Sequence, residues 1–480
     1  MVGASTQSAR TTRPSTENLV TKPGLSRRDF IAASTASALF ASTPVFGAGR
    51  KRRVALVGTG IRGTGFWGKH LNDNYADVIE YVGLCDINPG RLEYARKSMG
   101  VDCAVFTDFD AMLGEVRPDL VIVTTVDSTH DEFIVKGLQA GLDVITEKPM
   151  TTDETKCQAI LDAAEESKGR LIVALNYRNG IIFSRLKEHL LDKKIGRLTS
   201  IDFHWYLNTY HGASYFRRWH GLRDKGGTLL CHKAAHHFDL LNWWIDSEPV
   251  EVHAYGGLEH YGHNNPFRGN RCMDCPHTDK CEYHWDMTKD ERMMRLYHDN
   301  EKYDGYIRDN CLWRKEIDIF DKMAVQIRYA NDVHVSYTLT TYSPYEGFRV
   351  AFNGTKGRME TWEGVPSLDA TQQDQSLLHA REMDQSSHTE AEFQYHEIVS
   401  QLNFRNFERE RVPYVRSGHW GGDKVMLDRI FRNIVKRPEL DHRSDVRDGA
   451  MSVLIGIAAR KSIDEGRPVR IADLTSLDPV

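Results

Sequence analysis

Arg53-Val54-Ala55-Leu56-Val57-Gly58-Thr59-Gly60-Ile61-Arg62-Gly63 is the stretch that decides the fold. An apolar run enters a Gly-x-Gly-x-x-Gly turn, and a helical pattern begins between Phe66 and Leu71. Strand, glycine turn and helix in this order are typical of a dinucleotide-binding unit, because the missing side chains let backbone amides approach a diphosphate. The pattern predicts a Rossmann domain whose turn supplies the cofactor-binding residues Gly58, Gly60, Ile61, Arg62 and Gly63.

The second strand is expected from Val78 to Cys85, and it ends at Asp86. This acid follows the last glycine of the turn by roughly twenty residues, where the ribose-binding carboxylate of such domains is found. Asp86 would accept hydrogen bonds from ribose hydroxyls and repel a 2'-phosphate, which favours NAD as cofactor. Arg91 lies nearby in the sequence and keeps NADP open as an alternative.

The alternation of strands and helices predicts two structural domains after a leader. Buried-strand runs at 120–123, 143–146 and 171–175 continue the parallel sheet, so residues 50–172 form the Rossmann domain. Residues 173–480 are expected to form an α+β domain with a large, mainly antiparallel, open-faced sheet, because their strand candidates alternate in polarity. These strand candidates are Leu198–Tyr206, Val250–Tyr255, Met323–Tyr329, His334–Thr341 and Phe348–Phe352, with a hairpin turn at Asn331-Asp332.

Residues 1–49 differ in kind from the rest of the chain. Ser26-Arg27-Arg28-Asp29-Phe30-Ile31 precedes a charge-free, mildly apolar run that ends at Gly49. Paired arginines before such a run resemble a twin-arginine signal, which predicts export of the folded protein to the periplasm. The run is too short and too weakly apolar for a stable membrane span, and a disordered cytosolic leader is the alternative. The net charge of -5 provides no basic field for nucleic acid and favours a small-molecule partner.

Thr146-Glu147-Lys148-Pro149 stands at the end of a strand, where open α/β sheets bind their ligands. With the loop Thr124–His130 and with Asn176-Tyr177-Arg178, this string resembles the Gfo/Idh/MocA oxidoreductases, although Val126-Asp127 replaces the family's Pro-Asn. The resemblance covers most of residues 52–475 and implies assembly into a homo-oligomer through the open sheet. It also implies that the nicotinamide is lined by Thr125, His130, Glu147, Lys148 and Asn176.

The glycine-led segment from Gly226 to Asp239 supplies the predicted catalytic histidines. Many members of the family carry an Asp and a His four residues apart on this helix, and here the two positions read His232 and His236. A spacing of four places both imidazoles on one helical face. We expect His236 to act as general base, Lys148 as oxygen-binding proton relay and His232 as substrate orienter or second relay. The same spacing suits two metal ligands, which is the alternative.

Four cysteines gather in an insertion at about residues 257–315. Cys272, Cys275, Cys281 and Cys311 could supply four thiolates for a structural zinc. One or two disulfides are the competing interpretation, which an exported location permits. We favour the zinc site, which would hold the insertion together.

Three functions follow from these features. The first is an oxidoreductase that transfers hydride between NAD and a carbinol of a sugar, glycoside or polyol, with the cofactor tightly held. The second is a redox-neutral, NAD-dependent glycoside hydrolase that acts by transient sugar oxidation and elimination. Lys148 favours the first, because glycosidase relatives replace this lysine. The third is a non-catalytic sensor that keeps the dinucleotide fold, which the retention of both Lys148 and His236 disfavours.

Overall fold

The computed structural model describes residues 50–364, 395–415 and 418–480; the predicted twin-arginine leader, residues 1–49, lies outside them. The N-terminal part forms a six-stranded parallel sheet in the order β3-β2-β1-β4-β5-β6, with helices between the strands. Its strands are β1 (Arg52–Val57), β2 (Ile79–Cys85), β3 (Ala104–Phe106), β4 (Leu120–Val123), β5 (Asp143–Thr146) and β6 (Leu171–Val173). Its helices are α2 (Leu71–Tyr75), α3 (Pro89–Met99), α4 (Phe109–Val116), α5 (His130–Gln139) and α6 (Glu154–Glu166).

The glycine turn after β1 is held by close backbone approaches that only glycine allows. Gly58 has φ +89°, and a Cβ there would lie 2.6 Å from the carbonyl carbon of Thr124. A Cβ on Gly63 would lie 2.0 Å from the carbonyl oxygen of Gly58. The helix that follows begins as a π-helix, Gly63–His70, before it continues as α2. The predicted strand, turn and helix are confirmed. The first part of the helix differs from the prediction because it is a π-helix and not an α-helix.

The C-terminal part contains a nine-stranded sheet in the order β14-β13-β12-β11-β7-β10-β9-β8-β15. All neighbours are antiparallel except β7 and β10, so the predicted fold class is confirmed. Buried and exposed residues alternate along β9, which leaves one face of the sheet open. The strands are β7 (Leu198–Asn208), β8 (Pro249–Gly257), β9 (Lys322–Tyr329), β10 (His334–Ser343), β11 (Gly347–Gly354), β12 (Gly357–Glu363), β13 (Tyr395–Leu402), β14 (Phe407–Pro413) and β15 (Val469–Arg470).

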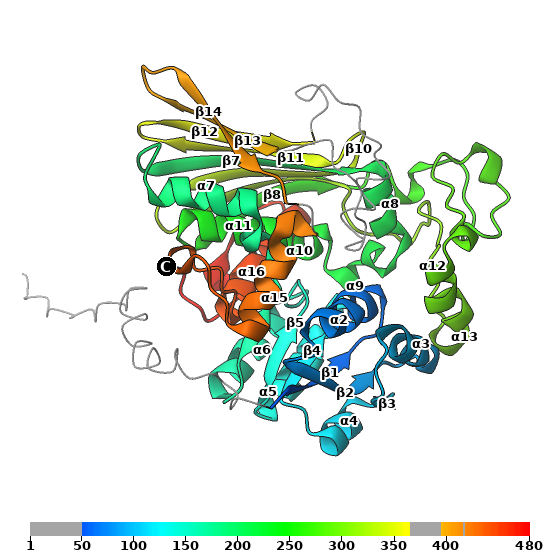
Figure 1. Ribbon diagram of the computed structural model, residues 1–480. Helices are drawn as coiled ribbons and strands as arrows, with labels where there is room; N and C mark the ends of the chain where they lie inside the picture. Colours follow the sequence, from blue (N-terminus) through cyan, green and yellow to red (C-terminus); the bar gives the residue numbers. More distant parts are fainter. Residues whose placement is uncertain (1–49, 365–394, 416–417) are drawn as a thin grey trace, which may run out of the picture. The chain divides into compact units, whose positions relative to one another are not determined.

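Helices of the C-terminal part lie between this sheet and the Rossmann strands, as Figure 1 shows for α7, α11 and α16. They are α7 (Ile181–Leu191), α8 (Thr209–Arg217), α9 (Arg223–Gly226), α10 (Leu229–His232), α11 (Ala234–Ile245), α15 (Gly422–Arg432) and α16 (Val446–Glu465). The insertion adds α12 (Glu291–Leu296) and α13 (Glu301–Asp304). None of the helices in the described part of the chain is long and apolar enough to cross a membrane.

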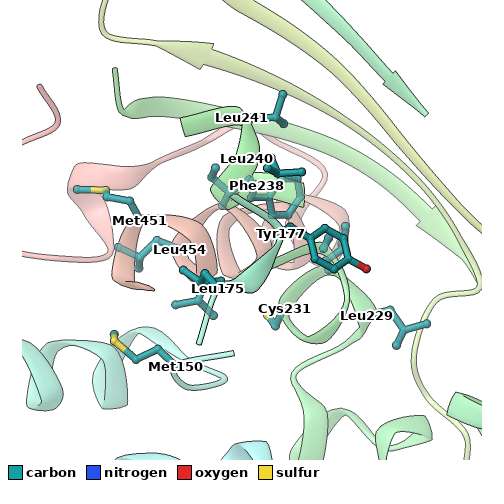
Figure 2. Packing of buried hydrophobic residues seen from close by; sticks show 14 of the residues in the cluster. Met150, Leu175, Tyr177, Leu229, Cys231, Phe238, Leu240, Leu241, Met451 and Leu454 are labelled. Carbon is teal, nitrogen blue, oxygen red and sulfur yellow. The ribbon is translucent and has the colours of Figure 1, made fainter. Parts of the chain in front are cut away.

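One apolar core connects the two parts behind the predicted catalytic residues. Met150, two residues after Lys148, is buried in the same cluster as Cys231 beside His232 and as Leu454 of α16. Figure 2 shows these side chains together with Leu175 after β6 and Phe238 of α11. Close packing leaves such side chains little freedom, so the strand end at residue 148 and the helix end at residue 232 are fixed relative to each other.

A buried ion pair supports this arrangement beneath α11. Arg178 Nε donates to both carboxylate oxygens of Asp239, at 3.0 and 2.8 Å, and Nη2 donates to Asp448 of α16 at 2.8 Å. The side chains of Arg178 and Asp239 are 3% and 0% exposed. A carboxylate in this place compensates a guanidinium that water cannot reach.

Replacing Asp239 with Asn should therefore destabilise the protein strongly, toward the lower end of about 3–5 kcal/mol, because Arg178 would lose its fully buried counter-charge and keep only the partly exposed Asp448. Guanidinium chloride unfolding followed by tryptophan fluorescence measures this loss. The control is Asp73→Asn, which removes an exposed pair with Lys69 and should cost less than about 1 kcal/mol. Equal effects of the two replacements would contradict the prediction.

Candidate active site

The cofactor loop of the Rossmann part is in contact with the insertion. The amide of Ile61 donates to the hydroxyl of Tyr297 at 2.9 Å, and a Cβ on Gly60 would lie 3.5 Å from the same oxygen. Asn88 Nδ2 donates to the carbonyl of Asn300 at 2.9 Å. The Ile61 amide thus donates to a hydroxyl oxygen, and the oxygens of a diphosphate are acceptors of the same kind.

Asp86 lies at the end of β2, as predicted, and is buried. Its Oδ2 accepts from the amide of Thr59 at 2.7 Å, and its Oδ1 accepts from Arg91 Nη2 at 2.9 Å. The same nitrogen of Arg91 lies 2.6 Å from Asp304 Oδ2 of the insertion. Two carboxylates therefore flank one guanidinium, and the net charge around Asp86 is negative. This environment disfavours a 2'-phosphate.

Glu147 connects the end of β5 to the helix of the glycine turn. Its Oε1 accepts from Arg62 Nε at 2.5 Å and from Trp67 Nε1 at 2.7 Å. The pKa of Glu147 is lowered: burial alone would raise it, but the cation of Arg62 and these hydrogen bonds outweigh that effect. Arg62 and Glu147 are thus paired with each other within the structure, and both border the loop that positions Lys148.

Lys148 and His232, two of the three predicted catalytic residues, are in direct contact. Lys148 Nζ lies 3.1 Å from His232 Nε2 and donates to the carbonyl of His232 at 3.1 Å. His232 Nδ1 lies 2.6 Å from Asp127 Oδ2, so the three side chains form a chain that ends at the ammonium. The helix is interrupted at Lys233: His232 ends α10, and α11 begins at Ala234.

Burial shifts all three groups of this chain toward their neutral forms. It raises the pKa of Asp127 and lowers the pKa values of Lys148 and of His232, the latter with help from the cation of Lys148. Two proton arrangements satisfy the three contacts. In one, Lys148 is charged and donates to His232, which donates to the carboxylate of Asp127; in the other, one proton has moved along each hydrogen bond and Lys148 is neutral. The arrangement can take up or release a proton at Nζ.

His236, the third predicted catalytic residue, stacks on a tyrosine instead of contacting Lys148 directly. Its ring lies 4.1 Å from that of Tyr177 at an interplanar angle of 2°, and it is 4% exposed. Nδ1 has no hydrogen-bond partner among the described residues. Burial, and next the cation of Lys148, hold the pKa of His236 well below its ordinary value, so a neutral imidazole with a free nitrogen is available as a base.

Three residues predicted to line the nicotinamide make contacts within the protein. His130 is buried, with Nδ1 2.8 Å from the carbonyl of Pro149 and Nε2 3.2 Å from that of Thr125. The Thr125 hydroxyl accepts from Thr129 at 2.9 Å, and Asn176 Nδ2 donates to Asp423 of α15 at 2.6 Å. His130 thereby connects the two loops that flank Lys148.

The predicted metal sites are not supported. Within the part of the chain that the structure describes, no three His, Cys, Asp or Glu side chains could hold a metal ion, which argues against both the zinc and the His232/His236 site. Cys272, Cys275, Cys281 and Cys311 line one small hollow, and all four are free. Arg217 Nη1 lies 2.8 Å from Cys272 Sγ, so a fixed cation stands beside this sulfur, where a zinc ion would be repelled. The alternative disulfides are likewise absent from these described cysteines.

Several residues of the site have no signal in the sequence that would have assigned them. Tyr177 stands in a motif that assigns it no role of its own. Tyr297 belongs to the insertion and follows Ile61 by 236 residues in the chain. His220 is buried, with its ring 4.2 Å from that of His232. Asp127 is the exception, because its departure from the family's loop pattern marked it as unusual.

Comparisons with known proteins identify the family. The profile described as "Oxidoreductase family, NAD-binding Rossmann fold" matches residues 52–175, and that described as "Oxidoreductase family, C-terminal alpha/beta domain" matches residues 187–471. The chain therefore belongs to the Gfo/Idh/MocA oxidoreductases, as its motifs indicated.

Individual relatives agree with this assignment. The chain is 33% identical over 446 residues to a Bacillus subtilis (strain 168) protein named as an oxidoreductase, YteT, covering 89% of this chain and 100% of that protein. An inositol 2-dehydrogenase/D-chiro-inositol 3-dehydrogenase of Lactiplantibacillus plantarum is 23% identical over 41% of this chain and 54% of its own length. The WlbA dehydrogenase of Chromobacterium violaceum, solved with NADH and UDP-GlcNAcA, has the same fold (TM-score 0.59, 19% identity, 89% of this chain and 99% of that chain).

The buried histidines predict how stability depends on pH. Burial lowers the folded-state pKa values of His130, His220, His232 and His236 below 6.5, so the unfolded chain binds protons that the folded chain does not. Stability should therefore fall as the pH drops below 6.5, by up to about 1.4 kcal/mol per pH unit for each such histidine. Urea unfolding between pH 7.5 and pH 5 measures the slope. His220→Asn should reduce this slope by the contribution of one proton, about 1.4 kcal/mol per pH unit, and replacement of the exposed His334 should leave the slope unchanged.

Proposed function

We propose that this protein transfers hydride between NAD and a carbinol of a sugar, glycoside or polyol. The observation that carries the proposal is the contact of Lys148 with His232, backed by Asp127, at the carboxyl end of a Rossmann strand. Ligands of open α/β sheets bind at this edge. A buried ammonium whose pKa is lowered, next to a proton-accepting chain, is what oxidation of an alcohol needs at the oxygen.

In this proposal the substrate hydroxyl binds beside Lys148 Nζ. Lys148 orients the oxygen and takes its proton, and His232 and Asp127 adjust by moving protons along the two hydrogen bonds behind it. His236, with its free Nδ1 over the ring of Tyr177, is the second base and faces the substrate from α11. Oxidation at one carbon releases one proton for each hydride, and either base holds it in a site that excludes water.

NAD fits the residues of the Rossmann part. The glycine turn would hold the diphosphate, with the Ile61 amide donating to it in place of the Tyr297 hydroxyl, and Asp86 would receive the ribose hydroxyls. The nicotinamide supplies the hydride acceptor when bound. Thr59 and Arg91 keep the carboxylate of Asp86 fixed in one orientation, which prepares it for the ribose.

The substrate class is supported by relatives and by location. Inositol dehydrogenases act on polyols, and the WlbA structure contains a sugar nucleotide, so sugars and polyols recur among proteins that this chain resembles. The paired Arg27-Arg28 supports our further proposal of export to the periplasm, where a tightly held cofactor avoids loss to the medium. We also propose a homo-oligomer assembled through the open face of the nine-stranded sheet.

Replacing Lys148 with Met should lower kcat by about 10²–10⁴-fold while NAD remains bound, because the side chain keeps its volume and loses its proton-transfer group. Purified protein is first analysed by native mass spectrometry for bound cofactor, and absorbance of the reduced nicotinamide is then followed with a panel of sugars and polyols. Lys69→Met, at the surface of the same part, is the control. Undiminished turnover by Lys148→Met would contradict the proposal, and release of aglycone without net reduction would favour the glycosidase alternative.

Neutralising the acids around Arg91 should weaken the preference for NAD. In the double variant Asp86→Ser, Asp304→Asn the guanidinium has no counter-charge and can pair with a 2'-phosphate. We expect the ratio of the NADP and NAD dissociation constants to fall by about tenfold or more. Quenching of tryptophan fluorescence measures both constants. The exposed Asp110→Asn on α4 is the control, and an unchanged ratio in the double variant would show that Asp86 does not select the cofactor.

A further inference from the structure

Arg308, in the insertion, is a buried cation without an acidic partner among the residues that the structure describes. Arg308 is 8% exposed, and neither its Nε nor its Nη1 has a hydrogen-bond partner among the described residues. The guanidinium carbon lies 5.0 Å from the ring centre of Trp285, which is a cation–π contact and leaves the N–H groups free. An arginine offers five donors, and burying them unpaired is costly.

Two other arginines repel the charge of Arg308. Burial, and next the cation of Arg218, lower the pKa of Arg308 to about 10. Arg217 adds to this repulsion, and its own donors are taken by Cys272 Sγ and the carbonyl of Tyr283. The adjacent acid, Asp309, is fully buried and accepts from Arg271 and from the amide of Met273. No ion pair of Arg308 or Arg218 with an acidic side chain occurs in the described ranges.

Arg218 places this positive charge beside the catalytic chain. Its Nε donates to the carbonyl of Ser214, and its guanidinium lies 5.2 Å from the ring centre of Tyr215. The Tyr215 ring is in turn 5.3 Å from the ring of His232. Both guanidinium groups also help to lower the pKa of His220, whose ring packs against His232. Arg218 therefore lies next to the proposed site of oxidation, and the charge of Arg308 acts on His220 beside it.

We propose that Arg308 and Arg218 together bind an oxyanion of the substrate, so that the preferred substrate is an acidic sugar with a carboxylate or phosphate group. This inference rests on the proposed function for the identity of the site. Guanidinium groups match carboxylate and phosphate oxygens geometrically, and one anion between the two would satisfy the free donors and remove the repulsion.

The diphosphate of the cofactor is the other source of an oxyanion. The substrate is favoured because Arg218 lies against Tyr215, whose ring borders His232, and because both arginines act on His220, which packs on His232. The acidic group that Arg218 does influence is Asp127, whose Oδ2 contacts His232. A second anion next to this pair of cations is therefore electrostatically favourable.

The test compares neutral and acidic sugars on the NAD-loaded protein. Isothermal titration calorimetry with D-glucose, D-glucuronate and D-glucose 6-phosphate separates the contribution of the anionic group, because the three share one ring. We expect at least one acidic sugar to bind about tenfold more tightly than glucose, and added sodium chloride to weaken only the acidic ligand. Arg308→Met should abolish this preference. Arg295→Met, which removes an exposed arginine of the same insertion, should retain it.

The remaining outcomes of these titrations also decide whether Arg308 binds an oxyanion of the substrate. Loss of NAD affinity in Arg308→Met with an unchanged sugar preference would assign the anion to the cofactor and overturn the proposal. Unchanged affinities for both, or no preference for acidic sugars in the native protein, would also overturn it. If Arg308→Met does not fold, Arg308→Lys and Arg218→Met serve instead, and both should reduce the preference. A protein that prefers acidic sugars but reduces no NAD would support this inference and contradict the proposed oxidoreductase activity.

Discussion

The contact between Lys148 Nζ and His232 is the constraint on which the rest of the structure depends. It joins the end of a Rossmann strand to a helix of the second part, and it holds an ammonium group in a largely buried place. Burying such a charge is costly unless acceptors surround it. The carbonyl of His232, its ring nitrogen and Asp127 supply these acceptors, and the apolar core around Met150 and Cys231 keeps them in position.

The insertion contributes to the same region at several points. Tyr297 contacts the glycine turn, and Asp304 contacts the arginine that holds the ribose acid. A segment of about sixty residues that carried only structural cysteines would not need two polar contacts along one ligand path. Its cysteines line a separate hollow, and one of them, Cys272, is in contact with Arg217. The insertion is thus better understood as part of the ligand site than as a metal-bound module.

The sequence predicted the parts of this molecule that depend on local patterns. The glycine turn, the acid after β2 and the alternation in β9 and β10 were all assigned, because backbone geometry and burial impose a fixed spacing on them. The structure does not support the predicted zinc site, and cysteine spacing says nothing about an arginine 55 residues earlier in the chain that approaches the sulfur. The partners Tyr297 and Arg308 could not be predicted either, because the path of an insertion depends on tertiary contacts and not on periodicity. The roles of the individual site residues remain predictions.

Two departures from the family pattern are explained by one contact. In the sequence, His232 replaces an acid on the helix, and Asp127 replaces the amide of the preceding loop. Considered separately, the first removes a negative charge next to Lys148 and the second adds one without evident purpose. The structure places Asp127 Oδ2 2.6 Å from His232 Nδ1, so the acid of the loop lies directly behind the histidine that contacts Lys148. The imidazole can accept a proton at one nitrogen and donate one from the other, so it connects Lys148 to Asp127 although these two side chains do not touch. Each of the two unusual residues is therefore the hydrogen-bond partner of the other, and we infer that they depend on each other.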